Sequence, residues 1–280
     1  MTVKEIRAAC VIGWPVAHSR SPLLHRYWIE QHGVAGAYRR EAVAPEDLSA
    51  FVANLAQHGY VGANVTLPHK EAALKLSDHD ARARAVGAAN TLWLDAGRLR
   101  STNTDVEGFI ENLDASAPGW DRDLTCAVVF GAGGAARAVV YGLVERGIDR
   151  IHVVNRTLSR AEDLRRRFGP RVHPARWQAM PGLLAEAGLI VNATSLGMTG
   201  KPDVDWDLDP APAHAVVADL VYVPLKTSLL SAAERRGLRT ADGLEMLLHQ
   251  GVRGFELWFG VRPQVTAELR ALMQRGLVEG

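Results

Sequence analysis

Cysteine is scarce in this chain, which has only Cys10 and Cys126 among its 280 residues. Both lie in apolar runs typical of buried strands, so we expect two reduced thiols in the core rather than a disulfide. Two thiols cannot complete a zinc site, and no cysteine–histidine cluster has ligand spacing. No metal site is predicted.

The chain also has almost no net charge and no long apolar run. The 32 basic and 31 acidic residues leave a formal net charge of +1, which offers no general attraction for nucleic acid or for an anionic membrane. The first residues, MTVKEIRAAC, lack the apolar stretch of a signal peptide, and no apolar run is long enough to span a bilayer. We therefore expect a cytoplasmic protein with no nucleic-acid or membrane partner.

Short apolar runs that alternate with amphipathic stretches are abundant in the first half of the chain. This repeated strand–helix order predicts an α/β fold with a largely parallel sheet covered by helices. Ser21 is expected to cap a helix with Pro22 at its first position, and Pro68 is expected to open another. The expected strands are 8–14, 37–43 and 60–66, and further helices are expected over 46–57 and 107–115.

A second strand–helix series begins at Cys126, after the polar connection DASAPGWDRD. A long helical pattern over 244–260 and a final helix near the C-terminus follow it. The length and the two series predict two α/β domains. The expected strands of the second series are 126–133, 150–155, 189–195 and 215–222.

The segment CAVVFGAGGAAR carries a glycine-rich turn between a strand ending at Phe130 and a helix. Its glycines let the backbone come close to a pyrophosphate, and the helix N-terminus offers free N–H groups. Any tight strand–helix turn can use glycines, but this context favours a dinucleotide site. The residues expected to contact the cofactor here are Gly131, Ala132, Gly133, Gly134 and Ala135.

The end of the next strand indicates which nicotinamide cofactor is used. NAD-specific folds place an acidic residue there, whereas this chain has Asn155, Arg156 and Thr157, followed by Arg160. Guanidinium groups suit the 2′-phosphate of NADP. Both arginines could also be solvated residues at a helix start, but together with the glycine turn they favour NADP over NAD.

Polar side chains gather in the first half at the ends of predicted strands, where ligands bind in open α/β sheets. Ser19, Ser21, Thr66, Asn90 and Asp105 would suit a substrate rich in hydroxyls. Each one alone could be a cap or a turn residue, and a single lysine such as Lys70 is most often a solvated surface residue. Their occurrence at successive strand ends argues for a binding site.

The segments HSRSP, NVTLPHK, GAANTL and NTD, followed by GAGGAAR, NRT, NATSLGM, VYVPLKT and DGLEMLLHQ, strongly resemble the shikimate dehydrogenase family over nearly the whole chain. The resemblance implies NADP-dependent interconversion of 3-dehydroshikimate and shikimate, a step of chorismate and aromatic amino acid biosynthesis. It implies that Lys70 and Asp105 are the catalytic pair. Val106 departs from the glycine that most often follows the aspartate in that family. The implied substrate-binding residues are Ser19, Ser21, Thr66, Asn90, Tyr222 and Gln250, and the further cofactor residues are Thr194, Ser195 and Gly243.

The resemblance also implies the domain boundaries. Residues 1–105 with 245–280 would form the substrate-binding domain, and residues 106–244 would form a Rossmann domain for NADP. We expect a small-molecule substrate and a monomer or homodimer. Histidines His18, His69 and His249 lie in these motifs, and we expect packing or rim positions for them rather than catalysis. Two alternatives are a quinate/shikimate dehydrogenase with broader substrate or NAD use, and a paralogue that binds shikimate or nucleotide without turnover.

Overall fold

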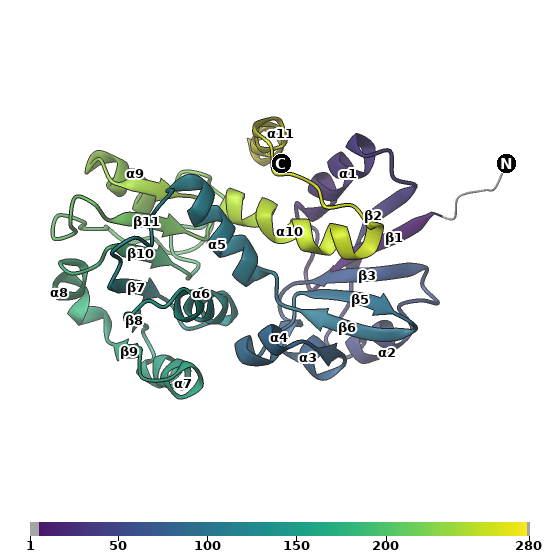
Figure 1. The fold of residues 1–280 in the computed structure, drawn as a ribbon, viewed down its shortest axis with the longest axis horizontal. Helices are drawn as coiled ribbons and strands as arrows, with labels where there is room; N and C mark the ends of the chain where they lie inside the picture. Colours follow the sequence, from purple (N-terminus) through teal and green to yellow (C-terminus); the bar gives the residue numbers. More distant parts are fainter. Residues whose placement is uncertain (1–5, 279–280) are drawn as a thin grey trace. The chain divides into compact units, whose positions relative to one another are not determined.

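The computed structural model describes residues 6–278, which divide into two compact units, each built around its own sheet (Figure 1). Unit 1 comprises residues 6–104 and Gln250–Gly276. Unit 2 comprises Asp105–His249 and residues 277–278. Helix α10 (Gly243–Phe259) belongs to unit 2 up to His249 and to unit 1 from Gln250 onwards.

The sheet of unit 1 has six strands in the order β2-β1-β3-β5-β6-β4. Strand β1 pairs in parallel with β2 and β3, so that Cys10 lies between Arg39 and Ala63. The sheet is thus mainly parallel around β1, as expected. The strands are β1 (Arg7–Gly13), β2 (Gly36–Ala42), β3 (Tyr60–Val65), β4 (Asp78–His79), β5 (Thr91–Asp95) and β6 (Arg98–Thr102).

A hairpin of β5 and β6 makes part of this sheet antiparallel, and the sequence pattern did not predict it. Its two-residue turn is formed by Ala96 and Gly97, with φ of 47° and 77°. Such a turn needs positive φ at both residues, and an alanine there is a weaker sequence signal than the usual Asn-Gly or Asp-Gly. The hairpin matters because it brings Thr91 opposite Thr102.

The helix expected to be capped by Ser21 begins one residue earlier than the sequence suggested. Helix α1 (Ser21–Gln31) has Arg20 as its N-cap, and Arg20 already has near-helical angles (φ −92°, ψ −4°). The Arg20 carbonyl accepts hydrogen bonds from the N–H groups of Leu23 and Leu24. Ser21 is therefore the first helical residue and its side chain makes no cap bond, so the prediction that it caps the helix was wrong.

Pro68 likewise stands just outside the helix that it was expected to open. Helix α3 (Lys70–Lys75) has His69 as its N-cap, which puts Lys70 at the first helical position. Lys70 therefore lies in the first turn of this helix. The other helices of unit 1 are α2 (Leu48–Ala53), α4 (Ala81–Val86) and most of α11 (Ala267–Val278).

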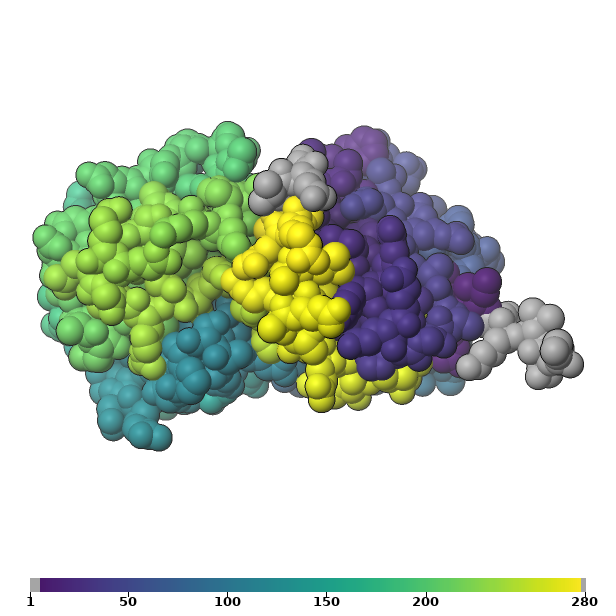
Figure 2. Space-filling model, turned by 90° about the horizontal axis from the view of Figure 1, so that it is seen from above, coloured from purple at the N-terminus to yellow at the C-terminus, as the bar shows by residue number. Residues whose placement is uncertain are grey.

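The C-terminal helices complete the core of unit 1. The Trp258 indole N–H donates a 2.8 Å hydrogen bond to the Leu92 carbonyl, and a Cβ added at Gly62 would lie 2.0 Å from that indole nitrogen. Helix α11 packs on α1, where a Cβ at Gly276 would meet Leu23. Figure 2 shows this yellow C-terminal segment beside the purple N-terminal helix. Segments from both ends of the chain therefore form one unit.

The sheet of unit 2 is wholly parallel, in the order β12-β11-β10-β7-β8-β9. This is the order of a Rossmann fold. The four expected strands are confirmed as β7 (Cys126–Phe130), β8 (Arg150–Val154), β10 (Leu189–Asn192) and β11 (Val216–Asp219). The short edge strands β9 (Val172–Ala175) and β12 (Arg239–Ala241) were not predicted.

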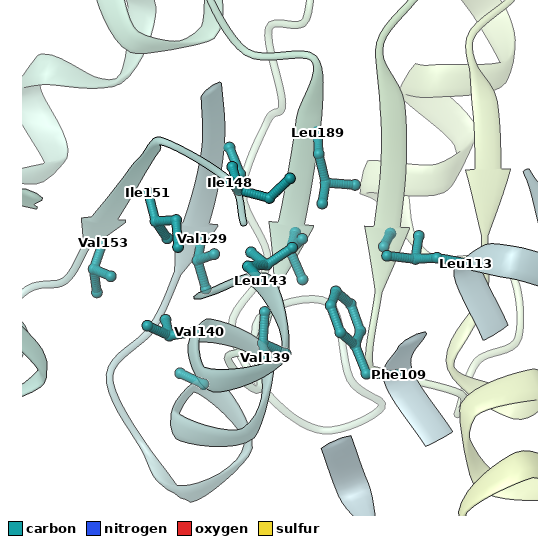
Figure 3. Close-up of a cluster of buried hydrophobic side chains, with 14 of the residues drawn as sticks. Phe109, Leu113, Val129, Val139, Val140, Leu143, Ile148, Ile151, Val153 and Leu189 are labelled. Carbon is teal, nitrogen blue, oxygen red and sulfur yellow. The ribbon is translucent and has the colours of Figure 1, made fainter. Parts of the chain in front are cut away.

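Helices cover both faces of this sheet. On one face, Phe109 and Leu113 of α5 and the apolar stripe of α6 point at Val129 and Leu189 of the sheet (Figure 3). Both faces are apolar because a parallel sheet covered by helices is buried on each side. The helices are α5 (Asp105–Ser116), α6 (Gly134–Glu145), α7 (Leu158–Phe168), α8 (Met180–Leu184), α9 (Ser228–Arg235) and a 3₁₀ turn at Trp177–Ala179.

Cys10 and Cys126 are buried free thiols, as expected. Among residues 6–278, no helix has the length and hydropathy needed to cross a membrane.

Candidate functional site

The carboxyl ends of β1 and β3 lie side by side in unit 1. The Trp14 N–H donates to the Leu67 carbonyl at 3.1 Å, and the Thr66 N–H donates to the Ile12 carbonyl at 2.9 Å. A Cβ added at Gly13 would come within 2.5 Å of Thr66 Cγ2, so a larger residue there would have to displace the Thr66 side chain. The loop that holds Ser19 is thereby brought near Thr66.

Lys70 follows Thr66 at the same edge of the sheet. The His69 N–H donates to the Thr66 carbonyl, and the half-buried Lys70 accepts at its carbonyl a 2.9 Å bond from the Ala89 N–H. The backbone of Lys70 is therefore bonded to Ala89, the residue that precedes Asn90. His69 is buried, and its Nε2 lies 2.7 Å from the Val43 carbonyl, which confirms the packing position expected for it.

Asn90 joins three elements of unit 1. Its Oδ1 accepts a 2.7 Å bond from the Thr104 N–H, and its Nδ2 donates to Thr104 Oγ1 at 3.1 Å. Nδ2 also lies 3.4 Å from Gln250 Oε1, on α10. Since the side chain is only 3% exposed, these bonds fix its orientation at the start of β5. Two of the predicted substrate residues, Asn90 and Gln250, are thus in direct contact.

A second polar group, formed by Tyr38, Asn64 and Thr91, was not singled out from the sequence. Tyr38 Oη donates a 2.6 Å bond to Asn64 Oδ1, and Asn64 Nδ2 reaches Thr91 Oγ1 at 3.3 Å. Burial raises the pKa of Tyr38 well above its usual value, although a hydrogen bond with Ser21 opposes this shift. Asn64 could have been found because it is part of NVTLPHK, a polar residue inside an otherwise apolar strand.

The ring of His25 forms one wall of this group. It stacks on Tyr38 with centroids 4.1 Å apart and also contacts Trp28, Phe255 and Trp258. Its two ring nitrogens are buried and have no hydrogen-bond partner among the described residues. Burial lowers the pKa of His25 to about 3, so the ring is neutral at physiological pH.

The loop before α1 is fixed by Arg40, whose Nη2 donates a 2.7 Å bond to the Ser19 carbonyl. The Ser21 N–H lies 3.4 Å from Ser19 Oγ. Unit 1 therefore gathers the predicted residues Ser19, Ser21, Thr66, Lys70, Asn90 and Gln250 around one edge of its sheet. Hydroxyl, amide and ammonium groups there suit a polyhydroxylated, anionic small molecule.

Asp105 is the first residue of α5 in unit 2 and is 3% exposed. A carboxylate in the first turn of a helix is stabilised by the helix dipole. Asp105 follows Thr104, whose N–H and hydroxyl both bond Asn90 Oδ1, so its backbone is anchored on that side. Val106 is buried and faces Gly142 of α6, so the departure from glycine at this position is accommodated by packing.

The glycine-rich turn of unit 2 has the form expected of a dinucleotide site. Gly131 has φ of 106°, and an added Cβ would lie 2.9 Å from the Ala193 carbonyl oxygen. A Cβ at Gly133 or Gly134 would meet nothing within 4 Å, so the space in front of the α6 N-terminus is open. These two glycines fit a pyrophosphate, which needs close approach to the backbone.

The end of β8 lies next to this turn, because the Gly131 N–H donates to the Val154 carbonyl at 2.9 Å. Asn155 Nδ2 donates to the Thr157 carbonyl at 2.8 Å and so closes the loop, while Arg156 and Arg160 are exposed. No carboxylate stands at the end of β8, where NAD-specific folds have one.

The loop after β10 holds Thr194 and Ser195. Thr194 Oγ1 donates to Asn192 Oδ1 at 2.6 Å and accepts from the Leu196 N–H at 3.0 Å, so the Thr194 hydroxyl shapes the loop itself. Ser195 is exposed. The loop therefore presents Ser195 at the same edge as the glycine turn.

Buried Asp219 ties this loop to the end of β11. It accepts hydrogen bonds from Asn192 Nδ2 at 2.9 Å, Thr227 Oγ1 at 2.7 Å and the Val221 N–H at 3.0 Å. Burial raises its pKa to about 6, against the effect of these three donors. Asp219 was not singled out from the sequence, because an aspartate at the end of a strand is typical of a turn.

Tyr222 and Gly243 lie near the same strand end. Tyr222 is half-buried and directly follows Val221. A Cβ at Gly243 would come within 2.4 Å of the Leu220 carbonyl oxygen, so the start of α10 can approach β11 only with glycine. Unit 2 thus gathers its predicted residues at the carboxyl edge of its own sheet.

His249 pairs with carboxylates of unit 2 and not with the predicted substrate residues. Its Nδ1 lies 3.1 Å from Glu111 Oε2, and its Nε2 lies 3.7 Å from Glu245 Oε2.

Three family models match the chain. The shikimate dehydrogenase substrate binding domain matches residues 11–92, and the shikimate/quinate 5-dehydrogenase model matches residues 121–198. The shikimate 5′-dehydrogenase C-terminal domain matches residues 243–273.

Individual proteins match over almost the whole chain. The shikimate dehydrogenase (NADP(+)) of Rhodopseudomonas palustris strain TIE-1 is 65% identical over 271 residues, which is 97% of each chain. The shikimate 5-dehydrogenase of Thermus thermophilus, solved with NADP(H) and shikimate, is 36% identical with a TM-score of 0.83, over 98% of this chain and 99% of that one. The quinate dehydrogenase of Corynebacterium glutamicum, solved with NAD, is 32% identical with a TM-score of 0.89, over 97% and 100%. The chain belongs to the shikimate dehydrogenase family.

Proposed function

We propose that this chain is an NADP-dependent shikimate dehydrogenase, which interconverts 3-dehydroshikimate and shikimate. The observation that carries the proposal is the 65% identity to a shikimate dehydrogenase (NADP(+)) across 97% of both chains. Because 97% of this chain is aligned, the similarity covers both units and not only unit 2. The reaction belongs to chorismate and aromatic amino acid biosynthesis.

We assign substrate binding to unit 1. The arrangement of Ser19, Ser21, Thr66, Asn90 and Gln250 at one sheet edge supports it, because a ring with a carboxylate and hydroxyls needs donors and acceptors on several sides. Tyr222, at the end of β11, is assigned to the substrate by the family resemblance.

We assign NADP binding to unit 2, so that the two units would correspond to the substrate and cofactor domains expected from the sequence. The open space before Gly133 and Gly134 supports a pyrophosphate there, and exposed Arg156 and Arg160 support a 2′-phosphate at the end of β8. Ala132, Ala135, Asn155, Thr157, Thr194, Ser195 and Gly243 complete the assignment. When bound, the cofactor supplies or accepts the hydride.

Lys70 and Asp105 are assigned to the proton transfer. Lys70 donates a proton to the oxygen that becomes the hydroxyl, or receives it in the reverse direction, and Asp105 orients the lysine and a ring hydroxyl. The backbone of Lys70 is bonded to Ala89, which precedes Asn90. This position supports access of Lys70 to a substrate bound by Asn90. Both residues match the family's catalytic positions.

NADP use distinguishes this proposal from a quinate dehydrogenase that uses NAD. The absence of an acidic residue at positions 155–157 favours NADP. Two buried free thiols suit a reducing cytoplasm. Whether the enzyme is a monomer or a homodimer is measured by sedimentation.

The test is a steady-state assay at the nicotinamide absorbance band, with shikimate and quinate each supplied with NADP and with NAD. We expect the highest kcat/KM for shikimate with NADP. Higher kcat/KM for quinate, or for NAD, would support the broader dehydrogenase. Binding of shikimate without turnover in any combination would support a non-catalytic paralogue.

A further inference from the structure

Arginine is concentrated in residues 150–176, which contain eight arginines and only two acidic residues. Five of these arginines lie toward the amino edge of the sheet, where β8 begins, α7 ends and β9 begins. All five have partners. Arg150 pairs with Glu186, Arg166 pairs with Asp163, Arg165 bonds the Val172 carbonyl, Arg171 bonds the Val144 carbonyl, and Arg167 also has a contact.

The other three, Arg156, Arg160 and Arg176, lie at the opposite, carboxyl edge of the sheet. All three side chains are exposed. Within the described part of the chain, no carboxylate forms an ion pair with any of them. Three guanidinium groups gathered without a counter-charge repel one another, and an anion bound between them would relieve that repulsion.

The backbone of Arg176 is held beside the loop that was assigned to the 2′-phosphate. Ala175 pairs with Val154 across β9 and β8, and the Asn155 N–H donates to the Ala175 carbonyl at 3.3 Å. Arg176 is the first residue after β9, so the chain leaves the sheet there beside the turn that contains Arg156.

Trp177, the residue after Arg176, holds the backbone of Arg176 in place. Trp177 packs against Phe130 with ring centroids 5.3 Å apart and against Trp206 at 5.9 Å. The Arg176 carbonyl also accepts a 3.0 Å bond from the Ala179 N–H. The backbone is thus anchored on both sides, and only the exposed side chain of Arg176 is left to reach a ligand.

We propose that Arg176 is a specificity-determining residue that supplies a third guanidinium, beside Arg156 and Arg160, to the subsite for the 2′-phosphate of NADP. The proposal rests on the assignment of NADP to unit 2. A phosphate group offers several charged acceptor oxygens, and guanidinium forks match them in bidentate geometry.

The test uses two probes that need no turnover: adenosine 2′,5′-bisphosphate, which has the 2′-phosphate, and 5′-AMP, which lacks it. Binding of each is measured by calorimetry to the full-length wild type and to Arg176→Ala. We expect Arg176→Ala to weaken 2′,5′-bisphosphate binding about tenfold, as for loss of one charge-assisted hydrogen bond, and to leave 5′-AMP binding unchanged.

Arg171→Ala is the matched control, because Arg171 precedes the same strand at the opposite edge and its loss changes the net charge equally. It is expected to leave both affinities unchanged, whereas Arg156→Ala should repeat the selective loss. Unchanged 2′,5′-bisphosphate binding in Arg176→Ala, or an equal loss for both probes, would overturn the proposal. An Arg171→Ala loss as large as that of Arg176→Ala would also overturn it, since net charge alone would then explain the effect.

The proposed function is judged separately, by shikimate oxidation with NADP in the wild type. A wild type that is active while Arg176→Ala retains full 2′,5′-bisphosphate affinity refutes the role of Arg176 alone. A wild type without that activity refutes the proposed function, whatever the probes do.

Discussion

The Tyr38 hydroxyl donates its proton to Oδ1 of Asn64 across 2.6 Å, and so determines which way the Asn64 amide is turned. With its oxygen held by Tyr38, the amide nitrogen is directed at Thr91 Oγ1 and at the Asn90 carbonyl. The Tyr38 hydroxyl of β2 is therefore linked, through Asn64 of β3, to the start of β5.

Replacing Tyr38 by phenylalanine should raise the KM for shikimate several-fold while kcat changes less. The ring that stacks on His25 remains, but Asn64 loses the hydroxyl that orients its amide. One hydrogen bond is worth about 1 kcal/mol, which corresponds to roughly fivefold in affinity. Tyr27→Phe, whose hydroxyl contacts exposed Glu268, is the control. An unchanged KM in Tyr38→Phe, with wild-type thermal stability, would show that the network does not position the substrate.

Lys70→Ala should lower kcat by ~10²–10⁴-fold, the usual contribution of a general acid–base group, with a smaller effect on shikimate binding. Lys75→Ala is the control, since Lys75 is exposed at the other end of the same helix. Steady-state kinetics measure both. Near-normal turnover of Lys70→Ala at saturating shikimate would falsify the assignment.

The double variant Lys70→Ala/Asp105→Ala should lose far less activity than the product of the two single losses. Groups that act as one unit in a transition state are strongly non-additive. The measurement is a double-mutant cycle on kcat/KM. Independent, multiplying effects would mean that the two side chains do not share the proton transfer.

His25 should make unit 1 labile to acid. Its pKa falls from 6.5 to about 3 on folding, so the stability that it contributes is complete above pH 6.5 and is lost as the pH falls toward 3. The loss is about 1.4 kcal/mol for each pH unit below 6.5. Denaturant unfolding at pH 7.5 and pH 5.5 should show a smaller difference for His25→Phe than for the wild type. Equal differences would mean that the ring is protonated in the fold.

Asp219 should act in the opposite direction in unit 2. Its pKa is raised on folding from 3.8 to about 6, so its contribution to stability is complete below pH 3.8 and is lost as the pH rises through 6. The total is about 3 kcal/mol. Asp219→Asn should remove this contribution of about 3 kcal/mol to the pH dependence of unfolding. The control Asp209→Asn, at an exposed position, should leave that contribution unchanged. Unfolding free energies between pH 4 and pH 7.5 decide the outcome.

Most of the fold could be predicted from hydrophobic pattern and turn residues. The buried strands of unit 2 were found because a parallel sheet covered on both faces needs continuous apolar runs. The turn after Phe130 was found because its glycines stand between a strand and a helix. The edge strands β9 and β12 were missed because they are short and Val172–Ala175 contains a proline, a residue that argues against a strand. The Ala96–Gly97 hairpin was missed because its turn signal is weak.

The site was predictable only in part, for a different reason. Side chains at strand ends, such as Thr66 and Asn90, could be recognised because chemistry and position coincide there. The neighbours of Tyr38 and Arg176 depend on which strands are adjacent in the sheet. Tyr38, for example, contacts Asn64, which is far from it in the sequence. Such partners follow from tertiary packing, which the local pattern does not contain.

The division of unit 1 between the two ends of the sequence fixes the order in which the units can be completed on the ribosome. All six strands of unit 2 have been synthesised by Ala241, whereas unit 1 waits for Phe255 and Trp258 to cover Trp28 and Leu92. A nascent chain that has emerged only to His249 therefore has all strands of the Rossmann sheet, while unit 1 is still incomplete. Premature termination near that residue would leave unit 2 able to fold and would expose an apolar face of unit 1 to aggregation and proteolysis.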